Sequence, residues 1–164
     1  MTAPTAWQAP DPETGPAPGV EFAGFGARLV AYIIDSLIIL VVIIALAIGA
    51  GLAVFVMPLL SILPILAILI VPLIYYPYYW QKSGQTPGKR MMGIKVVRDV
   101  DGGPLTWGTA IIRLIGYWVS GLVFYLGYIW VFIDKRKRAW HDLIAGTVVI
   151  KAPLRRAISL TAER

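Results

Sequence analysis

Asp35 and Arg113 are charged residues inside otherwise apolar stretches, and they are the side chains best placed to do chemistry. Between Arg28 and Lys82 the only charged residue is Asp35, and residues 105–133 contain only Arg113. A charged aspartate at the centre of a membrane helix costs about 2.5–3.5 kcal/mol, so it marks a functional-site hypothesis. Such a carboxylate could exchange protons for a cation, or it could hold neighbouring helices together through an ion pair.

The spacing of Arg28, Asp35 and Arg113 predicts that these side chains meet. Seven residues make almost two helical turns, so Arg28 and Asp35 share one face, with Asp35 about 10 Å deeper in the bilayer. Arg113 lies about 9 Å beyond Trp107, which we expect at the membrane interface, and this gives it a similar depth. We therefore expect Asp35 to pair with Arg113, with Arg28 or with both.

A second polar group, His141 and Asp142, follows the basic residues 135–138. Adjacent histidine and aspartate side chains could form a general base, but none of the serines lies in the sequence context of a nucleophile elbow. The chain has one histidine and no cysteine, which excludes a histidine-rich or thiolate metal centre within one chain. We therefore predict a protein that is not an enzyme and has no cofactor or bound metal.

Residues 84–90 carry glycines in a pattern similar to a phosphate-binding loop. The match fails because three residues instead of four separate the glycines, and Arg90 stands where Ser or Thr would hold magnesium. The glycines and the proline instead predict a tight turn. The candidate residues of this loop are Gly84, Gln85, Thr86, Gly88 and Lys89.

The composition indicates an integral membrane protein. Of the 164 residues, 58% are hydrophobic and 15% are charged, whereas soluble domains have about 25% charged residues. The net charge of +6 predicts that Lys and Arg collect on the cytoplasmic side beside anionic lipid headgroups. The expected partners are the lipid bilayer and either another membrane protein or a second copy of the chain, with no nucleic acid.

Two helices are predicted to cross the membrane, over residues 29–48 and 59–80, because each crossing needs about 20 residues. Gly49 and Gly51 are expected to loosen the first helix before its turn. Three prolines are expected to kink the second helix, namely Pro64, Pro72 and Pro77. The basic residues 81–104 should then be cytoplasmic, together with the N-terminus.

Residues 105–133 predict a short hairpin that returns to the side from which it entered. A single crossing would place the basic residues 135–138 outside, against the positive-inside rule. Two legs of about 13 residues each span only about 20 Å, so the hairpin must be tilted or re-entrant, with its bend near Ser120 and Gly121. The alternative is a third full span with the C-terminus outside.

Two β-branched runs, residues 94–97 and 147–151, predict short strands. They can pair only on the same side of the membrane, which favours the returning hairpin and a cytoplasmic C-terminus. The predicted fold is an all-α integral membrane bundle with two full spans, a third apolar hairpin or span, and this β pairing on the cytoplasmic side. A Pro-rich disordered tail, residues 1–20, and a basic tail, residues 152–164, flank it.

Three separated blocks resemble the RDD family of bacterial membrane proteins, which is named for one arginine and two aspartates. The blocks are residues 25–35, 84–97 and 141–149. On this sequence the arginine of the family corresponds to Arg28, and its aspartates correspond to Asp35 and Asp142. The resemblance extends over about residues 21–151 and implies a multi-pass protein of the bacterial plasma membrane.

The resemblance implies less about activity than about identity. Most members have no known molecular function, some are reported as sodium/proton antiporters, and related domains occur in proteins that help membrane complexes assemble. We favour a non-enzymatic accessory or scaffold module, because a single carboxylate lies within the predicted spans. The alternative is a monovalent cation/proton antiporter, or another small-solute transporter, that uses Asp35.

Overall fold

The computed structural model describes residues 20–124 and 126–152 of the chain. Its elements are α1 (Phe25–Val56), η1 (Pro58–Ser61), α2 (Ile62–Ser83), α3 (Pro87–Met91), β1 (Ile94–Arg98), α4 (Trp107–Leu122), α5 (Leu126–Ile129), η2 (Trp130–Phe132), α6 (Trp140–Ile144) and β2 (Thr147–Lys151). The described chain is therefore mostly helical, as predicted. The two predicted tails lie almost entirely outside the described residues.

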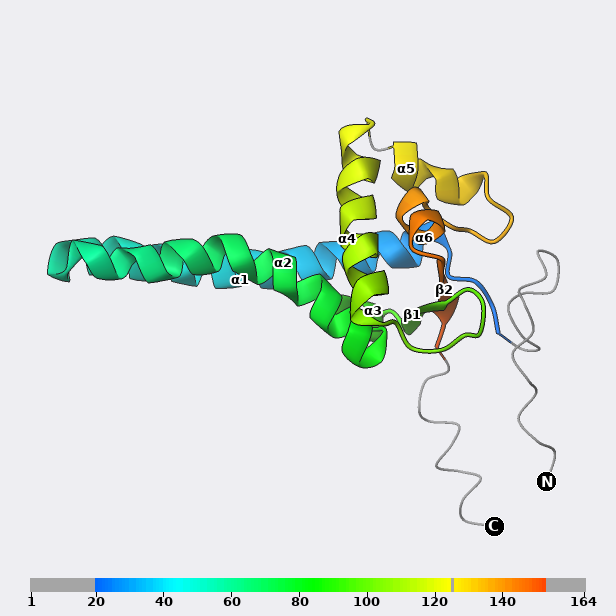
Figure 1. The fold of residues 1–164 in the computed structure, drawn as a ribbon, viewed down its shortest axis with the longest axis horizontal. Helices are drawn as coiled ribbons and strands as arrows, with labels where there is room; N and C mark the ends of the chain where they lie inside the picture. The colour runs from blue at the N-terminus through cyan, green and yellow to red at the C-terminus, as the bar shows by residue number, and fades with distance from the viewer. Residues whose placement is uncertain (1–19, 125, 153–164) are drawn as a thin grey trace, which may run out of the picture.

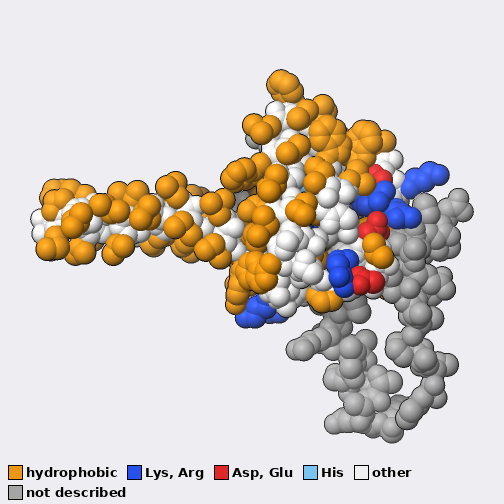
Figure 2. All heavy atoms as spheres, viewed as in Figure 1, with side chains coloured by type: hydrophobic (Ala, Val, Ile, Leu, Met, Phe, Trp, Pro, Cys, Tyr) orange, Lys and Arg blue, Asp and Glu red, His pale blue; other side chains and the backbone are white. Residues whose placement is uncertain are grey.

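Helices α1 and α2 form a long hairpin that projects from a head made by the other elements (Figure 1). Both are long and apolar enough to cross a membrane, which confirms the predicted pair of apolar helices as candidate spans. Figure 2 shows hydrophobic side chains over the projecting part of the hairpin, whereas charged side chains gather on the head. A surface divided in this way is typical of a hairpin that faces lipid and a head that faces water.

The predicted end of the first span at residue 48 is wrong, because α1 continues through Gly49 and Gly51, the glycines expected to loosen it, to Val56. A glycine costs a helix only about 1 kcal/mol relative to alanine, and an apolar environment favours an unbroken set of backbone hydrogen bonds. Pro72 and Pro77 do lie inside α2, and Figure 1 shows α2 changing direction before it reaches α3. Pro64 lies in the first turn of α2, where a proline removes no bond within that helix.

The third apolar segment contains a sharp bend that begins after Leu122, close to the predicted position near Ser120 and Gly121. Helix α4 continues to Leu122, and the following pair of short helices is turned by 110° relative to it. The Ser120 hydroxyl donates a hydrogen bond of 2.7 Å to the Gly116 carbonyl, which keeps this residue within the helix. Helix α4 also runs across the direction of the α1–α2 hairpin rather than beside it (Figure 1).

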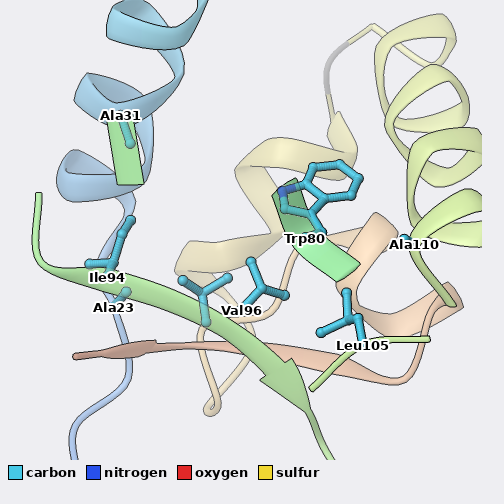
Figure 3. Packing of buried hydrophobic residues seen from close by; sticks show 8 residues of the cluster. Ala23, Ala31, Trp80, Ile94, Val96, Leu105 and Ala110 are labelled. Carbon is cyan, nitrogen blue, oxygen red and sulfur yellow. The ribbon is translucent and has the colours of Figure 1, made fainter. Parts of the chain in front are cut away.

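Strands β1 and β2 pair in antiparallel register, with Val96 opposite Val149, so the predicted strand pairing is confirmed. The pair covers the main hydrophobic core, which lies where the hairpin meets the head. Figure 3 shows the core side chains from both parts; the buried members are Ala23, Ala31, Trp80, Ile94, Val96, Leu105, Ala110 and Val149. Helices α1 and α4 both contribute to this core, and they also carry the buried charged residues Asp35 and Arg113.

Candidate functional site

A single carboxylate, Asp142 of α6, pairs with two arginines from two other helices. The Arg28 Nη1 atom of α1 lies 2.5 Å from Asp142 Oδ2, and the Arg113 Nη1 atom of α4 contacts Asp142 Oδ1. The backbone N–H of Ala139 donates to the same carboxylate at 3.0 Å. Asp142 and Arg113 are both fully buried, so this network joins α1, α4 and α6 away from water.

The electrostatics of this network keep Asp142 charged. Burial alone would raise the pKa of its carboxyl group, but Arg113 and Arg28 outweigh burial and hold the pKa well below its usual range. His141 behaves in the opposite way, because burial lowers the pKa of its imidazole and leaves it neutral at pH 7. The His141 ring stacks on Tyr117 with 3.8 Å between the ring centroids, which is a packing role.

Asp35 occupies a separate site at the foot of the hairpin, where it accepts three hydrogen bonds. The donors are the Thr86 hydroxyl at 2.5 Å, the Gly88 backbone N–H at 2.8 Å and the Tyr75 hydroxyl at 3.1 Å. Asp35 is 1% exposed. Thr86 also caps α3, because its hydroxyl accepts the backbone N–H of Lys89. These hydrogen bonds therefore attach α3 and the loop before it to α1.

The expected pairing of Asp35 with Arg28 or Arg113 is wrong for the residues that the structure describes. Both arginines pair with Asp142, and Asp35 takes neutral donors instead. The spacing of residues along a helix predicts which side chains share a face. It does not predict which other element of the fold packs against that face. The spacing argument considered only the apolar segments, whereas the carboxylate arrives from α6, after the basic run.

Residues 84–90, which were predicted to form a tight turn, also supply two of the hydrogen-bond donors to Asp35. Gly84 ends α2 with a φ of +70°, a conformation that favours glycine. At Gly88 a Cβ atom would lie 2.2 Å from the backbone oxygen of Ala31, so only glycine allows α3 to approach α1 this closely. Gln85 donates its side-chain N–H to a carbonyl of β1 at 2.9 Å. The prediction of a tight turn did not include the close approach of Gly88 to Ala31.

A cavity of about 340 Å³ lies between the two sites and is lined by Arg28, Asp35, Lys89, Arg113 and His141, together with apolar and aromatic side chains. Lys89 is 6% exposed, and its Nζ atom lies 5.4 Å from the centroid of the Trp80 ring. Within residues 20–124 and 126–152 it forms no ion pair with a carboxylate. Burial, together with the neighbouring Arg113, lowers the pKa of Lys89 to about 7.

The described residues hold no group of three or more His, Cys, Asp or Glu side chains that could bind a metal ion. The acidic groups of the site instead accept hydrogen bonds from nitrogen and hydroxyl donors. The site is therefore a junction of α1, α3, α4 and α6 around a cavity with an excess of buried cations.

Comparison with known proteins gives a family and several relatives. The model of the RDD family matches residues 22–146. The chain is 31% identical over 147 residues to the uncharacterized protein YxaI of Bacillus subtilis, covering 78% of this chain and 96% of YxaI. It is 36% identical over 89 residues to the uncharacterized membrane protein YteJ of the same organism, covering 54% of this chain and 53% of YteJ. No solved structure matches the chain.

Replacing Asp142 by Asn should destabilise the protein strongly, because the buried Arg113 and the partly buried Arg28 would lose their counter-charge. We expect Asp142→Asn to lower the free energy of unfolding by about 3–5 kcal/mol, the usual cost of breaking a buried ion pair. The matched control is Asp101→Asn, since Asp101 pairs with Arg98 at the surface and should contribute under about 1 kcal/mol. Thermal unfolding of both variants in one detergent measures the difference.

The effect of Asp142→Asn should also depend on pH. The pKa of Asp142 is lower in the folded protein than its ordinary value of 3.8, so the unfolded chain takes up this proton first as the pH falls. The stability that the carboxylate contributes is fully present above about pH 5 and is lost progressively below about pH 4. The gap between wild type and variant should shrink over that acidic range, and a gap that widened there would contradict the ion-pair assignment.

Proposed function

The chain belongs to the RDD family, and we propose that it is a non-enzymatic accessory or scaffold module of the bacterial plasma membrane. The observation that carries this proposal is the buried network of Arg28, Asp142 and Arg113, which joins the hairpin to the head. Each charge in it is paired with an opposite charge, as in a network that fixes the relative positions of elements. The names of the relatives above describe no enzymatic activity.

We propose that the α1–α2 hairpin crosses the bilayer and that the head, residues 81–104 and both termini lie in the cytoplasm. The charged side chains on the head support this orientation (Figure 2), because Lys and Arg favour the cytoplasmic side. The 32 residues of α1 are about 48 Å long, which exceeds a hydrocarbon core of about 30 Å. Arg28 and Asp35 then lie near the cytoplasmic interface rather than at the bilayer centre.

Helix α4 then lies along the cytoplasmic membrane surface instead of crossing the bilayer. One face of the helix is exposed and apolar, and its members are Trp107, Ile111, Ile115, Trp118 and Leu122. The opposite face is buried in the head, and its members are Ala110, Arg113, Gly116 and Ser120. A helix with one apolar outer face lies in the interface plane with that face toward the acyl chains. The pairing of β1 with β2 supports this placement, because it holds both ends of residues 105–133 on one side.

An antiporter role is the second candidate, and the observation that favours it is that Asp35 lines the cavity at the foot of the hairpin. Against this role, no other acidic residue occurs in α1 or α2, and Asp35 accepts its hydrogen bonds from three neutral donors. A cation entering from the hairpin would therefore meet one carboxylate that is already held by the protein. The accessory role agrees better with this arrangement.

Proton flux through the purified chain separates the two roles. In liposomes with an imposed sodium or potassium gradient, we expect no cation-dependent proton flux above that of protein-free liposomes. Asp35→Asn should leave this baseline unchanged, and Asp101→Asn serves as a surface control. Flux that needs either cation and is lost only in Asp35→Asn would replace the accessory role by an antiporter with Asp35 in its pathway.

Single-cysteine labelling tests the proposed orientation, because the chain has no cysteine of its own. Met57→Cys at the hairpin tip should react with a membrane-impermeant maleimide from outside intact cells. Val100→Cys, in the exposed loop after β1, should react only in inverted vesicles. Lys135→Cys, at an exposed position in the basic run, should resist labelling from outside, whereas a third full span would place it there and make it reactive.

A further inference from the structure

The cavity at the foot of the hairpin combines buried cations with an apolar opening. Its polar lining includes Arg28, Lys89 and Arg113, contributed by α1, α3 and α4. Apolar and aromatic side chains also line it, among them Leu29, Tyr32 and Ile129. These three are 44%, 49% and 48% exposed, so the cavity is bordered by apolar surface at the foot of α1 and at α5.

The cations around this cavity outnumber the anions. Asp142 is shared by Arg28 and Arg113, and Asp35 accepts hydrogen bonds from neutral groups. Lys89 is buried without an ion-pair partner among the described residues. Three basic side chains against two carboxylates leave Lys89 without a counter-charge among the described residues, and an anion bound beside it would favour its protonated form.

Several buried N–H groups beside the cavity also have no acceptor within the described part of the chain. They are Arg28 Nη2, Arg113 Nε and Arg113 Nη2; the Arg113 guanidinium also lies over the rings of Trp80 and Tyr117. A buried donor without a partner is unfavourable, and more so when it belongs to a charged group. One anionic group with several acceptor oxygens would satisfy both the unpaired donors and the surplus charge.

We propose that this cavity binds the headgroup of an anionic phospholipid. The phosphodiester oxygens accept hydrogen bonds from Lys89 and from the free N–H groups of Arg28 and Arg113, as guanidinium and ammonium groups bind phosphate. The glycerol backbone and the start of the acyl chains lie along Leu29 and Ile129. The volume of about 340 Å³ holds a headgroup, and the rest of the lipid stays in the bilayer.

The charge of the site favours a phosphodiester over a doubly charged anion. Asp35 also lines the cavity, and its carboxylate would repel a second negative charge. The single surplus positive charge matches the single negative charge of a phosphodiester. The site also needs a position at the membrane interface, and the foot of a membrane hairpin provides one. This inference goes beyond the proposed function and holds for an accessory protein and an antiporter alike.

Lipid binding by the full chain in a neutral detergent tests the site. We expect native mass spectrometry to show one retained dioleoylphosphatidylglycerol per chain, bound about tenfold more tightly than dioleoylphosphatidylcholine, because only the former carries a net charge for the site to pair. Inorganic phosphate should not displace it at equal concentration. Equal binding of the two lipids would overturn the proposal, and binding of phosphate as tight as that of the lipid would assign the site to a soluble anion instead.

Two lysines provide matched variants for the same titration. Lys89→Gln removes the surplus charge and should weaken phosphatidylglycerol binding about tenfold, since a charge-assisted hydrogen bond is lost. Lys82→Gln removes an equal charge from the exposed end of α2 and should change binding less than about twofold. Equal losses in both variants would show general surface attraction and overturn the site. Leu29→Trp, which narrows the opening from an exposed position, should also weaken binding and gives a second readout if Lys89→Gln does not fold.

Discussion

One buried carboxylate, Asp142, determines how the head is attached to the hairpin. A charge removed from water costs several kcal/mol unless it is paired and hydrogen-bonded, and Asp142 meets this requirement with Arg28, Arg113 and the Ala139 N–H. The two arginines belong to two other helices, α1 and α4, so neither can move without weakening the pairing of a buried charge. The position of α4 and α6 on α1 follows from this network and from the hydrophobic core beside it.

The arginine and the two aspartates that name the family act on this chain as two separate attachments to the first turns of α1. Arg28 connects α1 to α6 through Asp142, whereas Asp35 connects α1 to the loop and α3 through Thr86 and Gly88. The three residues therefore do not form one catalytic cluster. They attach α6 and α3 to α1 beside one cavity, and this explains why charges concentrate at the foot of the hairpin.

The sequence predicted the elements of the fold better than it predicted their contacts. Hydropathy found α1 and α2, and β-branched runs following glycines found β1 and β2, because these signals are local. The partners of Asp35 lie about 50 residues away in the sequence, in a polar loop. Thr86 and Gly88 are uncharged, so a search for opposite charges does not find them. Helix spacing predicted an ion pair for Arg113 but gave it the wrong carboxylate, and the resemblance to the family identified Arg28 and Asp142 without predicting that they pair.

A double-mutant cycle between Arg113 and Asp142 tests the central claim most directly. Arg113→Gln and Asp142→Asn are measured singly and together by reversible unfolding in detergent. If the two groups are one buried pair, the double variant should cost at least about 2 kcal/mol less than the sum of the single variants, because the second substitution removes a charge that the first left unpaired. If the losses of unfolding free energy in the two single variants simply add in the double variant, Arg113 and Asp142 do not form one buried pair. That result would contradict the account, and other contacts would have to attach the head to the hairpin.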